Sequence, residues 1–152
     1  AIKIVHDKLQ QSEDITQVKM DDYIHDLLTT IFSSYTIEPV KVESEIEEIY
    51  IETKAAGTIG LIINEIATNA IKHGFNYQSP SRFFVSFARS SASQEYELVL
   101  SNSGNPFPGD INIDEPKTLG MQLLLSLVDQ IDGTIELERR PHTKFKIKFP
   151  NT

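Results

Sequence analysis

The strands that this sequence predicts come in neighbouring pairs, and a helix separates each pair from the next. Alternating apolar residues indicate most of the strands, and turn-forming residues lie within the pairs. Strands joined by a short turn pair antiparallel, because a parallel pair needs a long crossover connection. We therefore expect an α+β fold, a two-layer α/β sandwich in which a mixed, mostly antiparallel sheet is covered on one face by helices.

Periodicity gives approximate bounds for these elements. The predicted elements are a helical segment at 1–11, a helix with an apolar stripe from Ile24 to Tyr35 and Asp21 or Asp22 as its cap, strands at 40–42 and 49–51, a helix at 56–73, strands at 83–88 and 96–101, a helix at 119–131, and strands at 134–138 and 144–149. Parallel winding from strand through helix to strand is less favoured, because most strands come as adjacent pairs.

Composition restricts the classes of function. The 152 residues are enough for one domain, and the formal net charge of −8 argues against nucleic-acid binding through a basic face. The chain has no cysteine, which excludes disulfides and thiolate metal sites and suits the cytoplasm. Its apolar runs are far shorter than the ~20 residues that span a bilayer, so we expect no direct membrane contact.

The helix at 56–73 has an isoleucine-rich side and a polar edge. Glu65, Asn69 and His73 follow at intervals of four residues, so they stack along one side, and Lys72 lies beside them. Mg²⁺ prefers oxygen ligands and shares the phosphate oxygens of its nucleotide. Asn69 could hold the metal with support from Glu65, while the two basic residues neutralise phosphate. On spacing alone, a solvated polar face explains the same pattern.

A loop at 102–117, rich in glycine and proline, leads into the last helix. Thr118 is a good N-cap for a helix that begins at Leu119, and Gly120 allows a ligand close to the backbone. The free amides at this helix start form an anion site, and Lys117 adds positive charge nearby. An ordinary capped helix would have the same residues.

Asn102 and Thr143 are weaker candidates because each lies at an expected strand end. The side chain of Asn102 could bond an adenine edge, but as a turn residue it needs no ligand. Thr143 needs no role beyond starting a strand. Lys72 is not preceded by the glycine-rich loop of a Walker A site, which excludes P-loop chemistry.

Several segments occur in the order that defines a known family. Residues 64–75, NEIATNAIKHGF, resemble the N-box of the GHKL ATPases in the form typical of histidine kinases. Residues 101–108 and 118–123 resemble the two glycine boxes, and residues 132–135 and 143–145 match the strands that follow. The resemblance covers nearly the whole chain and implies the Bergerat ATP-binding fold.

This resemblance implies the ATP-binding catalytic domain of a two-component sensor histidine kinase. Such a protein-histidine kinase transfers the γ-phosphoryl group of ATP to a histidine, which would lie outside this chain. ATP and Mg²⁺ are the implied cofactors, Glu65 and Asn69 the implied catalytic residues, and Asn69 the implied metal ligand. The implied nucleotide contacts are Asn69, Lys72, His73, Asn102, Gly104, Thr118, Leu119, Gly120 and Thr143.

The resemblance also implies partners and domain organisation. Residues 1–14 would be the remnant of an upstream dimerisation and phosphoacceptor region, and residues 15–152 the catalytic domain. The implied partners are those upstream helices and a response regulator protein. The implied location is the cytoplasm, with membrane association open for the full-length protein.

Three positions depart from the family pattern. Asn102 stands where an aspartate normally accepts a hydrogen bond from adenine, and an amide lacks the charge that strengthens that bond. Pro106 replaces the second glycine of the first glycine box, and His142 replaces another expected glycine. Two alternatives therefore stay open. One is a degenerate regulatory or interaction module with weak nucleotide binding, and the other a GHKL ATPase that hydrolyses ATP with Glu65 as general base.

Overall fold

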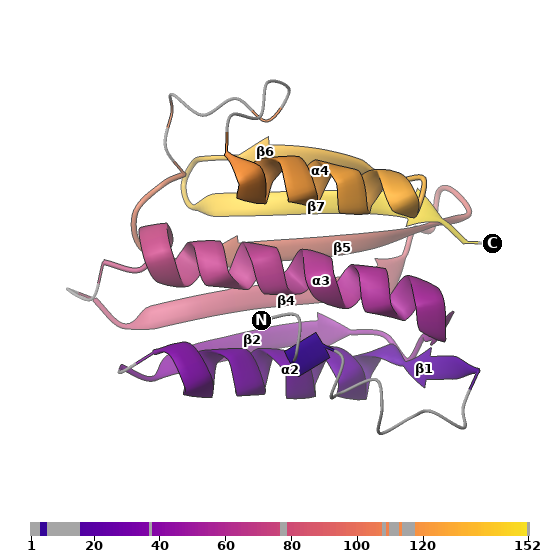
Figure 1. The fold of residues 1–152 in the computed structure, drawn as a ribbon, viewed down its shortest axis with the longest axis horizontal. Helices are drawn as coiled ribbons and strands as arrows, with labels where there is room; N and C mark the ends of the chain where they lie inside the picture. Colours follow the sequence, from indigo (N-terminus) through magenta and orange to yellow (C-terminus); the bar gives the residue numbers. More distant parts are fainter. Residues whose placement is uncertain are drawn as a thin grey trace.

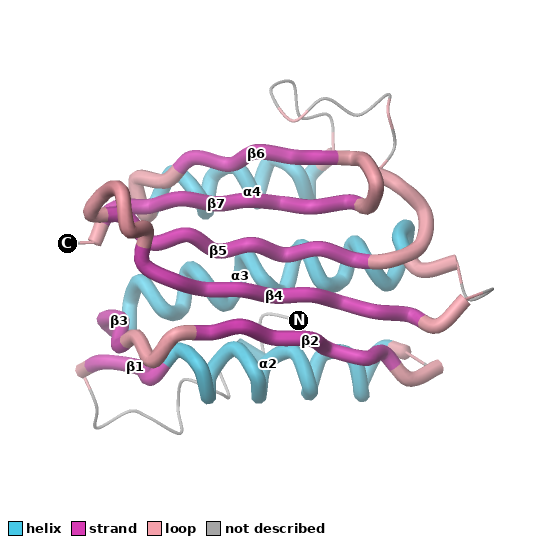
Figure 2. The backbone as a smooth tube through the Cα atoms, turned by 180° about the vertical axis from the view of Figure 1, so that it is seen from behind, coloured by secondary structure: helices cyan, strands magenta, loops and turns pink. Residues whose placement is uncertain are grey.

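The computed structural model describes residues 4–5, 16–36, 38–76, 79–107, 109, 113 and 118–151. The elements are β1 (Gln17–Lys19), α2 (Met20–Tyr35), β2 (Val40–Ile46), β3 (Tyr50–Glu52), α3 (Thr53–Asn69), η1 (Ala70–Gly74), β4 (Ser81–Arg89), β5 (Glu95–Asn102), α4 (Leu119–Gln130), β6 (Thr134–Glu138) and β7 (Thr143–Pro150). Helices α2, α3 and α4 lie side by side over one face of the main sheet, as Figure 1 and, from behind, Figure 2 show. The expected two-layer sandwich is confirmed.

The main sheet has five strands in the order β2-β4-β5-β7-β6. The hairpins β4–β5 and β6–β7 are antiparallel, as the sequence predicts, and β5 also pairs antiparallel with β7. β2 lies parallel to β4, with α3 in the connection between them. This one parallel pair uses the strand–helix–strand winding that the sequence disfavours, so the sheet is mixed and mostly antiparallel.

The predicted pairing of residues 40–42 with residues 49–51 is wrong. β3 pairs instead with β1 in a separate two-stranded sheet, in which Val18 lies opposite Ile51. The acidic residues between β2 and β3 do not form a hairpin turn, because β2 continues to Ile46 alongside β4 and the Glu47 N–H then donates to the carbonyl of Phe87. β1, with only three residues, has too short a pattern to be predicted.

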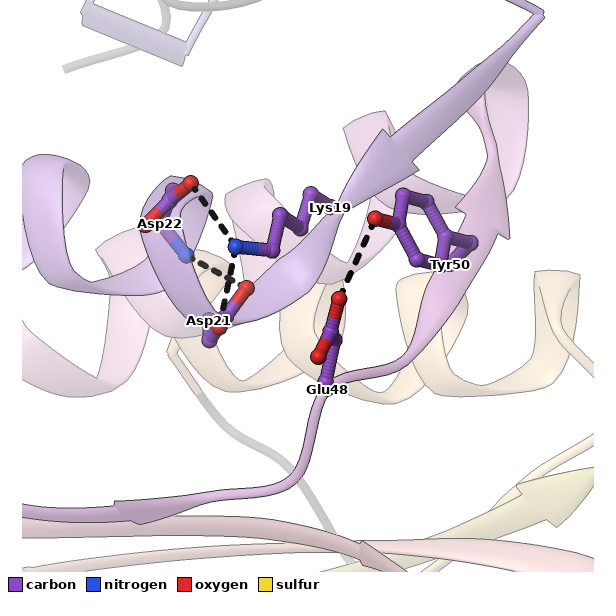
Figure 3. A network of polar contacts seen from close by, with 5 residues as sticks. All are labelled: Lys19, Asp21, Asp22, Glu48 and Tyr50. Carbon is purple, nitrogen blue, oxygen red and sulfur yellow. Dashed lines mark hydrogen bonds and ion pairs between the residues drawn. The ribbon is translucent and has the colours of Figure 1, made fainter.

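Helix α2 buries the predicted apolar stripe, but its start differs from the prediction. Neither aspartate caps it: the residue before the first turn is Lys19, and Asp21 and Asp22 lie inside that turn. There they favour the helix dipole and hold the Lys19 ammonium at 3.6 and 3.5 Å, an arrangement visible in Figure 3. These two carboxylates raise the pKa of Lys19. Tyr35, predicted in the stripe, is 47% exposed.

The core lies between the helices and the sheet. The isoleucines of α3 supply its centre, with Ile59, Ile62 and Ile63 fully buried against aromatic residues of the strands such as Phe83 and Phe145. Isoleucine is a poor helix former, so packing stabilises this helix. Among the described residues, no helix has both the length and the apolar character needed to cross a membrane.

Most of the predicted N-terminal segment lies outside the described residues. Ile4 and Val5 are helical, and Val5 is buried against the core. The rest of residues 1–11, and with it the boundary at residue 14, stays a prediction.

Candidate functional site

The central helix ends in a widened turn. The predicted helix at 56–73 is present as α3, and it continues as the π-helical η1, closed by the Phe75 N–H donating to the Ala70 carbonyl at 2.9 Å. Single π turns inside helices are frequent at functional sites. Lys72 and His73 lie in this turn and are exposed, so both can meet a charged ligand.

A small pocket lies between the end of this helix and the sheet. Asn69 and His73 line it from the helix, while Asn102 and Thr143 line it from β5 and β7, where they are register partners. Asn102 and Thr143 are both buried. The other lining residues are Ile66, Ala70, Gly74, Asn105, Pro106, Phe107 and Phe145. Four of the predicted nucleotide contacts therefore meet in one place, although they come from four elements, α3, η1, β5 and β7.

A hydrogen bond to the neighbouring backbone orients the side chain of Asn102. Its Nδ2 donates to the carbonyl of Ser103 at 2.9 Å. Gly74 makes room for this amide, because a Cβ at Gly74 would lie 2.5 Å from the Asn102 Nδ2. Gly74 therefore packs directly against an amide that lines the pocket.

Gly104 has a structural role close to this pocket. Its φ of +98° lies in the region that favours glycine, and a Cβ there would run into the carbonyl oxygen of Gly74. The next residue, Asn105, donates its N–H to that same oxygen at 2.7 Å. The first glycine box thus folds back onto the end of the central helix, and Gly104 supports the pocket without lining it.

The start of α4 meets the polar edge of α3. The Oγ1 of Thr118 accepts from the Met121 N–H at 3.2 Å, which confirms the predicted N-cap. A Cβ on Gly120 would collide with the Oε1 of Glu65, so glycine lets this carboxylate lie against the helix start. The side chain of Leu119 is 82% exposed. Lys117 lies outside the described residues.

The predicted metal ligand at this site is Asn69. Among the described residues, no group of three or more His, Cys, Asp or Glu side chains gathers to hold an ion. Mg²⁺ commonly takes most of its oxygen ligands from phosphate and water. The Glu65 carboxylate, one helical turn from Asn69, fits a supporting role.

Phe107 and Phe145 are pocket residues that sequence reasoning missed. The Phe107 ring meets the Phe145 ring edge-on, with centroids 5.7 Å apart, and the Arg139 guanidinium carbon lies 5.8 Å from the Phe107 centroid. The signal was a lone aromatic residue between two prolines just after the first glycine box.

A larger hollow of about 910 Å³ lies elsewhere, beside β3 and the last residues of β7, and none of the predicted site residues lines it.

Comparison with known proteins gives a consistent set of relatives. A histidine kinase family model matches residues 1–35. The sensor histidine kinase PdtaS of Mycobacterium tuberculosis is 23% identical over 137 residues, which make up 89% of this chain and only 27% of PdtaS.

Solved structures agree with this relationship at the level of the fold. The histidine kinase domain of a blue-light activated histidine kinase from Erythrobacter litoralis superposes with a TM-score of 0.81 at 22% identity, covering 94% of this chain and 70% of that one. The catalytic domain of the histidine kinase ThkA gives a TM-score of 0.72 at 17% identity, covering 89% and 94%.

Proposed function

This chain is a relative of sensor histidine kinases with the fold of their catalytic domains, and we propose that it binds ATP with Mg²⁺ and supplies the γ-phosphoryl group to a histidine carried elsewhere in the kinase. The chain spans about a quarter of the length of its curated relatives, so the activity of a whole kinase is itself part of this proposal. A response regulator, upstream dimerisation helices and a cytoplasmic location belong to the same proposal.

The observation that carries the proposal is the meeting of Asn69, Asn102 and Thr143 in one pocket. These residues lie far apart in the sequence and come from α3, β5 and β7. The polar edge of the central helix lies beside this pocket, with Glu65 against the start of α4. A merely solvated polar face would give no reason for this convergence.

Each residue then has a defined task. The Oδ1 of Asn102 would accept from the adenine amine, and Thr143 would contact the same edge of the base. The phosphates would extend toward the amides at the start of α4, where Thr118 and Gly120 lie and the helix dipole favours negative charge.

The remaining residues would help to neutralise the negative charge of the phosphates. Asn69 and the neighbouring Glu65 would hold Mg²⁺, which neutralises the phosphates when bound. Lys72 and His73 would approach the phosphates from the exposed π turn. Phosphoryl transfer needs little covalent chemistry from the protein, so these residues would act by positioning and charge stabilisation.

Calorimetric titration of the 152-residue chain with ATP and Mg²⁺ tests this proposal. Asn69→Ala removes one oxygen ligand and keeps a good helix former, so we expect affinity to fall about tenfold or more in the presence of Mg²⁺. The matched control is Gln130→Ala, which removes an amide from the exposed C-terminal end of α4. Equal affinities of the two variants would disprove the metal assignment.

Two further outcomes separate the alternatives. Absence of heat at millimolar nucleotide for the wild-type chain would favour the degenerate module that Asn102 and Pro106 suggest. Steady release of phosphate by this domain alone would favour a GHKL ATPase that uses Glu65 as base. Phosphorylation of a histidine in the full-length protein, dependent on Asn69, would support the kinase.

A further inference from the structure

The candidate nucleotide pocket is too small for an adenine ring. Its volume is about 10 Å³, which is about the space that admits one water molecule. One wall must therefore move before a nucleotide can enter. Most of the lining residues belong to α3, η1, β5 and β7, whose backbones are held by helical and ladder hydrogen bonds. The exceptions are the consecutive residues 105–107.

Phe107 has the largest side chain of these three residues, and two contacts hold it in place. Its ring packs edge-on against Phe145, which is buried in β7 and lines the same pocket. The guanidinium carbon of Arg139 also lies over the Phe107 ring, at 5.8 Å from its centroid, within the range of a cation–π interaction. Arg139 lies just after β6, in the connection to β7.

We propose that Phe107 closes the nucleotide pocket in the free domain and that Arg139 is the positioning residue that holds it closed. This inference rests on the proposed function, because it describes access to the same pocket. Opening breaks the contact between the cation and the ring. Since the observed dissociation constant is the intrinsic one divided by the open fraction, weakening this contact raises apparent affinity.

The test compares two neighbouring arginines. Arg139→Gln removes the cation over the ring, and Arg140→Gln makes the same charge change at the adjacent exposed residue. We expect Arg139→Gln to tighten ATP binding about two- to fivefold in calorimetric titration, the scale of an exposed cation–π contact. Arg140→Gln should leave affinity unchanged or lower it slightly, because a general loss of positive charge disfavours an anion.

A second readout needs no nucleotide. The chain contains no tryptophan, so Phe107→Trp places a single tryptophan at the closing position, and its emission can be excited selectively over that of the tyrosines. In this background, adding Arg139→Gln should increase quenching by acrylamide about twofold, and adding Arg140→Gln should not. A merely structural role of Arg139 would lower thermal stability without changing quenching selectively at residue 107.

The outcomes separate this inference from the proposed function. Unchanged quenching after Arg139→Gln, or ATP affinity that falls below that of Arg140→Gln, would overturn the closing role of Arg139. If no variant binds ATP, the proposed function fails, while the quenching experiment still decides whether Arg139 holds Phe107 in place.

Discussion

At the scale of single residues, Asn102 combines a donor and an acceptor that face different partners. Its Nδ2 group donates to the Ser103 carbonyl, and its Oδ1 is the acceptor that we assign to adenine. A carboxylate at this position would improve the acceptor because a charged group forms stronger hydrogen bonds. It would also place a second oxygen near the Ser103 carbonyl oxygen. The hydrogen bond that Nδ2 donates to this carbonyl would then be lost. A carboxylate at this position should therefore strengthen ATP binding and lower the stability of the fold.

Asn102→Asp should separate these two effects. We expect ATP to bind about 1 kcal/mol more tightly, and the free energy of unfolding to fall by about 1–2 kcal/mol as the bond to Ser103 is lost. Calorimetric titration and urea unfolding measure the two quantities. The control is Asn151→Asp, which retains the Oδ1 acceptor for the Tyr96 hydroxyl at 2.9 Å. Weaker ATP binding by Asn102→Asp would reject the adenine role.

Single residues also mark the limit of prediction from sequence. Asn69, Asn102 and Thr143 could be found because a family motif or a strand end singles them out. Phe107 has only its place between two prolines as a signal, because an aromatic residue in an irregular segment has no periodic neighbours, and its packing on Phe145 depends on where β7 lies. Likewise, the need for glycine at Gly74 appears only once the amide of Asn102 lies beside it.

At the scale of elements, the two hairpins were predictable because short turns join strands that are adjacent in the chain. β2 was misassigned because its partner, β4, follows only after the whole of α3. The alternating pattern of residues 40–42 shows that a strand exists, yet it does not say which strand pairs with it. Pairing over such a distance is decided by burial of Val40 and Val42 against the core, which a local pattern does not contain.

The packing of α2 on α3 contains a buried hydroxyl without a partner. The Tyr23 hydroxyl makes no hydrogen bond within the described part of the chain, and it lies where a Cβ on Gly60 would be. Burial raises the pKa of Tyr23, because the charged phenolate is disfavoured away from water. The unfolded chain would ionise near the usual value of about 10 while the folded chain remains neutral. Stability is thus independent of this group below pH 10 and falls above it.

Tyr23→Phe should remove both the buried hydroxyl without a partner and its ionisation at high pH. We expect a gain of about 1 kcal/mol in the free energy of unfolding at pH 7, because a buried polar atom without a partner is eliminated. Between about pH 10 and pH 11 the wild type should lose stability that the variant retains. Urea unfolding at several pH values measures this difference. The surface variant Tyr50→Phe, at a position 49% exposed, is the control. A parallel decline of Tyr23→Phe and wild type would show that the hydroxyl ionises freely.

At the scale of the whole molecule, the formal net charge of −8 opposes the binding of an anionic nucleotide. Positive charge is present at the site only locally, from the Lys72 side chain and the helix dipole at the start of α4. Part of the long-range repulsion is screened by salt, since the Debye length is about 10 Å at 0.1 M ionic strength. Magnesium instead neutralises the phosphates at short range. The long-range repulsion can therefore be varied with salt, and the charge of the phosphates can be varied independently with magnesium.

Removal of magnesium should therefore weaken ATP binding most at low ionic strength. With EDTA present, we expect affinity at about 0.02 M salt to be lower than at about 0.2 M salt, because the acidic domain repels the free nucleotide and salt screens this repulsion. With saturating Mg²⁺, the dependence on salt should be smaller, because a metal-bound nucleotide carries less charge. Calorimetric titration at both ionic strengths, using adenosine as an uncharged control, measures these differences. If affinity instead falls with salt in the absence of magnesium, attraction by local cations such as Lys72 outweighs repulsion by the net negative charge, and the prediction is wrong.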